Sequence, residues 1–102
     1  MSITANVSDD GNTLTIAIEG RFDASVLDDF RKCYEESESS AASEYVVDFN
    51  DTMYLDSSAL GMLLVLRDYA GGDESDIKII NCSDEIKKIF TISNFSQLFD
   101  IQ

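Results

Sequence analysis

Apolar and polar residues alternate along two segments near the start of the chain, residues 2–7 and 13–18. This spacing is typical of strands with one buried face, and the polar connection containing Gly11 predicts a hairpin between them. We expect Gly20 to end the second strand. The side of that strand expected to face the core carries Leu14, Ile16 and Ile18.

Three later segments repeat apolar residues three and four positions apart, as amphipathic helices do. The first helix is expected to open at residues 23–25, the second to run from 56–58 to about residue 69, and the third to start at 83–85. Asn94 is expected to end the third helix in a left-handed conformation. The expected buried faces comprise Val26, Leu27, Phe30, Cys33 and Tyr34, then Leu60, Leu63, Leu64, Leu66 and Ala70, then Ile86, Ile89 and Phe90.

Residues 44–50, between the first two helices, form a continuous apolar run, which indicates a central strand buried on both faces of a helix-covered sheet. Residues 76–80 predict another strand, 51–55 a loop and 95–101 a final edge strand. Alternating strands and helices imply right-handed crossovers and a largely parallel sheet, with the first strand antiparallel. We therefore expect one α/β domain over residues 1–102, with a single mixed, mostly parallel sheet of four or five strands and about three helices, in the order β-β-α-β-α-β-α-(β).

The chain is strongly acidic, with 20 acidic and 7 basic residues and a net charge of −13. Such a surface repels phosphate backbones and anionic membranes, so we expect no direct contact with nucleic acid and no membrane insertion. An acidic, serine-rich stretch over residues 35–44 is expected to finish the first helix and form a mobile loop, and it suits either a basic partner or solubility. The longest nearly apolar run, 59–66, is too short to span a bilayer, and the N-terminus lacks the features of a signal peptide, which predicts a cytoplasmic protein.

Several enzyme classes are excluded by the residues that the sequence lacks. Without histidine there is no Ser-His-Asp or Cys-His catalysis and no histidine-containing zinc site. Cys33 and Cys82 are far apart in the sequence and are interpreted as buried thiols. The five glycines form no phosphate-binding loop. We therefore expect no catalytic residue, metal or cofactor.

The most informative segment joins a loop to the start of the second helix, where Ser57 and Ser58 follow Asp56. The first turn of a helix has free backbone N–H groups and a positive dipole end, so it tolerates a phosphate. A phosphoserine there would add about −1.5 to −2 charges and three acceptor oxygens. On physical grounds alone an ordinary helix cap with no further role is favoured for these three residues, because caps of this kind are common.

This segment resembles the phosphorylation motif of the bacterial anti-sigma factor antagonists (anti-anti-sigma factors) of the STAS-domain family. The matching positions are Leu55, Asp56, Ser57, Ser58, Ala59, Leu60 and Gly61. Residues 18–23 resemble the family's strand that ends in Gly, an apolar residue and Asp, and residues 45–49 resemble its central strand. Residues 86–95 resemble its third helix and following turn, with Asn94 where the family usually has Gly. The resemblance therefore covers nearly the whole chain.

The resemblance implies that Ser57 is the phosphoacceptor, with Ser58 as the second choice. The unphosphorylated form would bind and sequester an anti-sigma factor that is often also a serine kinase, phosphorylation would release it, and a serine phosphatase would reset the chain. The protein would then be a ligand and a kinase substrate rather than an enzyme, and a monomer when free. The residues expected to contact the partner are Asp23, Tyr54, Asp56, Ser58, Leu60, Gly61 and Met62. One departure is that the family often has a further C-terminal helix, which this chain either lacks or replaces with residues 95–101.

Three other functions remain open at this point. A STAS module could act as a scaffold or output regulator in a biofilm, stress or chemosensory pathway without a sigma factor. A receiver-like domain would use Asp48 or Asp51 as its acceptor, although no acidic pair ends the first strand and no Lys follows the late strand. An enzyme with Ser57 as nucleophile would need Lys or a carboxylate as its base, because there is no histidine.

Overall fold

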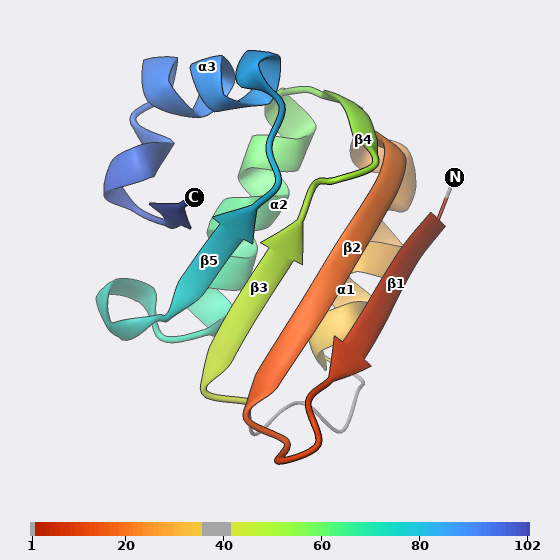
Figure 1. Cartoon of the computed structure of the whole chain (residues 1–102), viewed down its shortest axis with the longest axis vertical. Helices are drawn as coiled ribbons and strands as arrows, with labels where there is room; N and C mark the ends of the chain where they lie inside the picture. Colours follow the sequence, from red (N-terminus) through yellow and green to blue (C-terminus); the bar gives the residue numbers. More distant parts are fainter. Residues whose placement is uncertain (1, 36–41) are drawn as a thin grey trace.

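A computed structural model describes residues 2–35 and 42–102 and shows a single mixed sheet backed by helices (Figure 1). The strands are β1 (Ser2–Val7), β2 (Thr13–Phe22), β3 (Glu44–Asp48), β4 (Thr52–Leu55), β5 (Ile77–Ile80) and β6 (Asp100–Ile101). Five of them follow the order β1-β2-β3-β5-β6, and β4 pairs with β2 outside this path. β1 is antiparallel to β2, and the other pairs are parallel. The expected mixed, mostly parallel α/β fold is confirmed.

In the described residues, three α-helices connect the strands: α1 (Leu27–Glu35), α2 (Ser57–Tyr69) and α3 (Asp84–Ile92). Short 3₁₀ turns cover Ala24–Val26, Gly72–Glu74 and Phe95–Gln97. The helix starts follow the expected caps, since the side chain of Ser83 accepts the backbone N–H of Ile86, and Asn94 has the left-handed φ of 63° that ends α3. None of the helices in the described ranges is long and apolar enough to cross a membrane.

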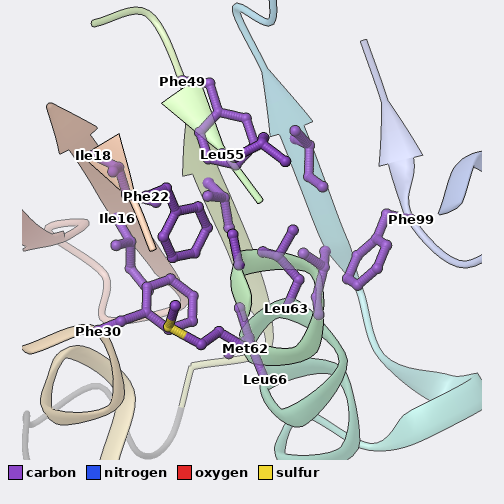
Figure 2. Packing of buried hydrophobic residues seen from close by; sticks show 14 of the residues in the cluster. Ile16, Ile18, Phe22, Phe30, Phe49, Leu55, Met62, Leu63, Leu66 and Phe99 are labelled. Atoms are coloured by element: carbon purple, nitrogen blue, oxygen red, sulfur yellow. The ribbon is translucent and has the colours of Figure 1, made fainter. Parts of the chain in front are cut away.

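The core lies between the sheet and the two helices α1 and α2, which pass behind it in Figure 1. The expected core side of β2 is confirmed, because Leu14, Ile16 and Ile18 are at most 1% exposed. Figure 2 shows side chains from β2, α1 and α2 meeting in this layer. A row of near-parallel aromatic rings, spaced 5.6–5.9 Å between centroids, extends the core toward the end of the chain through Phe49, Phe90, Phe95 and Phe99.

The prediction that residues 44–50 are buried on both faces is wrong. Burial alternates along β3, with Tyr45 and Val47 buried and Val46 only half-buried. Helices α1 and α2 pack against the same face of the sheet, so in the part of the chain that the structure describes the other face is open and carries residues such as Thr15 and Ala17. The apolar run therefore reflects a two-layer rather than a three-layer arrangement.

The prediction of a loop over residues 51–55 is also wrong, because residues 52–55 form β4. Gly20 does not end β2; it has a φ of 86° and bends the strand, which continues to Phe22 and pairs there with β4. The register shifts beside Gly20 so that Met53 is the extra, bulged residue of β4. Two hydrogen bonds stabilise the bend. The Gly20 N–H donates to the Asp51 carbonyl at 3.0 Å, and the Thr52 hydroxyl donates to the Ile18 carbonyl at 2.6 Å.

Several helix faces differ in detail from the expected ones. Leu27 and Leu64 are 44% and 42% exposed, whereas Met62 is only 4% exposed. The 3₁₀ turn before α1 advances the chain faster around the axis than an α-helix does, which changes the phase of the stripe at Leu27. In α2 the buried positions are Ala59, Met62, Leu63 and Leu66. The final segment is a 3₁₀ turn followed by the two-residue edge strand β6, and most of the expected acidic loop lies outside the described residues.

Candidate phosphorylation and partner-binding site

The pairing of β2 with β4 brings the starts of two helical segments together. Arg21 lies beside Tyr54 in the ladder, and Phe22 lies beside Leu55. The next residue on each strand is an aspartate that caps the following helical segment, Asp23 on one side and Asp56 on the other. The two capping aspartates therefore sit at the same end of the sheet.

Ser57 and Ser58 are the first two residues of α2, and both are exposed. Within the described ranges, neither hydroxyl has a hydrogen-bond partner. Their side chains are therefore open to an enzyme that approaches from solvent. This placement agrees with the motif but does not by itself choose between the two hydroxyls.

The Asp56 side chain accepts hydrogen bonds from backbone N–H groups at the start of α2. Its Oδ1 accepts the N–H groups of Ser58 at 3.0 Å and Ala59 at 3.3 Å. These amides and the positive helix dipole would otherwise form an anion site. A phosphate on Ser57 would find those donors taken by a carboxylate, so it would have to project away from its own helix.

Arg21 is a site residue that the sequence did not reveal. Its guanidinium carbon lies 4.0 Å from the centroid of the Tyr54 ring, and its Nε donates to Asp23 Oδ2 at 3.2 Å. The Ser25 hydroxyl, the Ser25 backbone N–H and this guanidinium together hold the pKa of Asp23 below its usual value. The sequence did not indicate this role, because Arg21 contacts Tyr54 only through the β2–β4 pairing, which was not predicted.

Apolar side chains surround this end of the molecule. Met53, carried outward by the bulge in β4, is 86% exposed, and Tyr54 is 40% exposed. On α2, Gly61 lies one turn beyond Ser57 on the same exposed stripe, which continues with Leu64. These residues extend the exposed surface around Ser57 in two directions.

Two expected contacts are placed differently. Met62 points into the core (Figure 2) and is almost fully buried, so the prediction that it contacts a partner is wrong. Leu60 is half-buried against the core. A Cβ added at Gly61 would meet no atom within 4 Å, so contacts inside the chain do not explain this glycine.

The alternative acceptors take part in structural contacts. Asp48 accepts the Asn50 backbone N–H at 2.9 Å and the Asn81 side-chain amide at 3.0 Å. A receiver-like site or a serine nucleophile could use the cation of Lys78. The Lys78 ammonium instead donates a hydrogen bond of 2.6 Å to Glu44, which lies at the end of β3 opposite to Asp48. Lys78 is thus paired with Glu44 and not with Asp48.

A shallow cavity of about 130 Å³ lies on the open face of the sheet, away from Ser57. It is lined by Thr4, Ala17, Ile18, Glu19, Asp48, Asn50 and Asp51. The described part of the chain contains no group of three or more acidic, Cys or His side chains arranged to hold a metal ion. Cys33 and Cys82 are free and half-buried, and burial raises the pKa of Cys82 to about 11, so its thiolate is disfavoured.

Comparisons with known proteins agree with the fold and with the STAS-domain resemblance. The family model described as "Mlab, STAS domain" matches residues 5–100. A STAS-domain containing protein of Pseudomonas aeruginosa (strain UCBPP-PA14) is 55% identical over 101 residues, which cover 99% of each chain.

Solved structures of anti-sigma factor antagonists share the fold at low sequence identity. The Bacillus cell fate determinant SpoIIAA in its phosphorylated form superposes with a TM-score of 0.75 and 17% identity over 99% of this chain and 91% of that one. An anti-sigma factor antagonist from Mycobacterium paratuberculosis superposes with a TM-score of 0.79 and 16% identity over 98% and 85% of the two chains.

Proposed function

The chain belongs to the STAS-domain family, and we propose that it is an anti-sigma factor antagonist whose partner binding is switched by phosphorylation of Ser57. In its unphosphorylated form it binds and sequesters an anti-sigma factor that also acts as a serine kinase. Phosphorylation releases that partner, and a serine phosphatase restores the binding form. The chain serves as ligand and substrate, and the catalytic groups belong to its partners.

One observation carries this proposal: Ser57 is exposed at the first position of α2, and its hydroxyl is unpartnered in the described part of the chain. Apolar and polar residues lie at the same end of the sheet: Met53 and Tyr54 on β4 are exposed, and exposed Arg21 at the end of β2 pairs with the half-buried Asp23 that follows it. Such a surface supplies apolar contact area together with hydrogen-bonding groups that fix orientation. The choice of Ser57 over Ser58 rests on the family motif.

The switch works through local charge and requires no refolding. A phosphate on Ser57 adds about two negative charges next to Asp56, whose carboxylate already holds the first-turn amides. The dianion therefore stays on the surface that the partner covers, where it must be desolvated on binding. Each tenfold loss of affinity needs only about 1.4 kcal/mol, so one unpaired dianion is sufficient to eject a partner.

Phosphorylation-site mapping tests the acceptor. Purified wild-type protein, Ser57→Ala and Ser58→Ala are incubated with ³²P-labelled ATP and an extract of the source cells, and the labelled peptide is located by mass spectrometry. We expect Ser57→Ala to lose the label and Ser58→Ala, the matched control, to keep it. Full labelling of Ser57→Ala would refute the assignment.

A capture experiment tests the switch. Wild type, Ser57→Ala and Ser57→Asp are immobilised and exposed to the same extract, and retained proteins are identified by mass spectrometry. We expect an anti-sigma factor with a kinase domain to be retained by wild type and Ser57→Ala and to be strongly depleted on Ser57→Asp. All three should have similar circular dichroism spectra and melting temperatures. Equal retention by Ser57→Asp would leave Ser57 as an ordinary helix residue.

A second candidate function follows from the description of the matching family model, which names Mlab and not a sigma-factor antagonist. On this alternative, the same surface binds a component of another regulatory assembly and the chain acts as a scaffold or output regulator. The identity of the captured protein separates the two functions, because only the first requires an anti-sigma factor among the proteins that Ser57→Asp loses.

A further inference from the structure

Strand β1 forms one edge of the sheet (Figure 1). It pairs with β2 along its whole length, and in the described ranges no strand pairs with its outer side. An edge of this kind presents a row of backbone N–H and C=O groups to its surroundings.

The hydrogen-bond pattern shows which residues of β1 face outward. The Ser8 N–H donates to the Thr13 carbonyl at 2.9 Å, and bonded pairs alternate along an antiparallel ladder. With the observed register, Asn6 and Thr4 therefore form the next bonded pairs with β2. The Gly20 N–H, which points away from β1 to Asp51, fits the same alternation on β2. The residues left with outward N–H and C=O groups are Ile3, Ala5 and Val7.

This edge lacks the features that usually protect an exposed strand. Residues 2–7 contain no charged residue, no proline and no glycine, although 26% of the whole chain is charged. Their pairing with β2 is regular, without a bulge. Natural edge strands are commonly blocked by lysine, proline or bulges, so an unblocked strand of six residues indicates a pairing surface.

We propose that two copies of this chain associate by antiparallel pairing of β1 with β1, which joins their sheets across a two-fold axis. The register that uses all the outward groups places Ala5 opposite Ala5 of the second copy. Ile3 then lies opposite Val7, and Val7 opposite Ile3. Each of these three pairs exchanges two hydrogen bonds. The strand is therefore complementary to itself in its backbone groups.

The side chains match in the same register. Ile3 and Val7 share the helix-covered face, because their partners on β2 are Ile18 and Leu14, which are buried. In the pair they meet across the two-fold axis, and Val7, now 41% exposed, is covered. On the open face, Thr4 meets Asn6. Apolar residues thus oppose apolar ones, and polar residues oppose polar ones.

Charge gives this association a recognisable salt dependence. The strand brings no charged side chain face to face with its copy, but each chain carries a net charge of −13. The long-range repulsion between two such chains is screened as ionic strength rises. Pairing through β1 should therefore tighten with salt, whereas binding of a basic partner would weaken. This proposal replaces the expectation of a monomer in solution.

Sedimentation equilibrium tests the association over protein concentrations from about 1 to 500 μM, at low and at high NaCl. We expect wild type to move from 11.3 kDa toward twice that mass, and to do so at lower concentration in high salt. Ala5→Pro removes the central outward N–H without taking a bond from the β1–β2 ladder, and it should weaken association at least tenfold.

A second variant and a matched control exclude a folding artefact. Ala5→Lys places two ammonium groups side by side on the two-fold axis and should also weaken association at least tenfold. Ile92→Lys makes the same charge change at an 81% exposed position of α3 and should dimerise as wild type does. If Ala5→Pro has a lower melting temperature than wild type, the association of Ala5→Lys decides whether β1 forms the contact.

Amide hydrogen exchange measured by NMR locates the contact residue by residue. On raising the protein concentration, the amides of Ile3, Ala5 and Val7 should gain protection, while those of Thr4 and Asn6, already in the ladder, should not change. A wild-type protein that stays at 11.3 kDa under all conditions overturns the proposal. So does a dimer that survives both substitutions at Ala5, or one that weakens with salt.

Discussion

The start of helix α2 offers a direct test of the cap on which the candidate site depends. Asp56→Ala removes the carboxylate that accepts the N–H groups of Ser58 and Ala59 at 3.0 and 3.3 Å. Loss of an N-cap side chain costs about 1 kcal/mol, within a range of about 0.5–2. In a domain of this size, 1 kcal/mol lowers the melting temperature by about 4–8 °C.

Two further variants separate the cap from the charge. Asp56→Asn keeps an oxygen that can accept the same two N–H groups and loses only the interaction of the charge with the helix dipole, about 0.3–1 kcal/mol. Asp68→Ala removes an exposed carboxylate from the last turn of the same helix, where a negative charge is unfavourable, and should leave the stability equal or slightly higher.

Urea and thermal unfolding followed by circular dichroism give the comparison, with an unchanged urea m-value showing that the same surface is exposed on unfolding. The expected order of stability is Asp68→Ala at or above wild type, then Asp56→Asn, then Asp56→Ala. If Asp56→Ala is as stable as wild type, or Asp56→Asn loses as much as Asp56→Ala, then the two hydrogen bonds do not hold the helix start and the reasoning fails.

The remaining predictions concern an ion pair and a bend. The hydrogen bond from Lys78, followed by that from the Thr13 hydroxyl, lowers the pKa of Glu44. The Glu44 carboxylate therefore stabilises the fold above the unfolded pKa of about 4.3, and this stabilisation is lost as pH falls through the lower folded pKa. Glu44→Gln should therefore be less stable than wild type at neutral pH, and the difference in urea midpoint should shrink as pH falls below about 4.3; a difference that grows in acid would contradict this. Gly20→Ala should lower the free energy of unfolding in urea by about 1–2 kcal/mol, because φ at this position is 86°. The added Cβ meets no atom within 4 Å, so the loss would come from backbone strain alone, and an unchanged urea midpoint would exclude that strain.

The parts of the fold that the sequence predicted well are those governed by local chemistry. Capping residues at Asp56 and Ser83 marked the two helix starts, and alternation along β2 identified its buried side. The left-handed turn at Asn94 was also predicted from residue type and position. In each case, the signal lies within a few residues of the feature that it predicts.

The parts that the sequence did not predict depend on contacts between distant segments. Residues 52–55 contain too short a pattern to indicate a strand, and they form β4 only because β2 bends at Gly20 and offers them an edge. Arg21 enters the site through that same pairing. The sequence did not predict that β3 is buried on one face only, because an apolar run does not indicate whether helices cover one or both faces of a sheet.

The same carboxylate links the fold to the proposed switch. Because the Asp56 side chain accepts the Ser58 and Ala59 amides, α2 begins at Ser57 without help from the Ser57 hydroxyl. The Ser57 hydroxyl, the proposed acceptor, is thus not needed to start the helix, and its charge could change while the core against which α2 packs, including Leu63 and Leu66, stays as it is. A cap that had used the serine itself would have tied phosphorylation to unfolding of the first turn. In the proposed switch, capping by the aspartate and phosphorylation of its neighbour would allow partner binding to change while the fold stays constant.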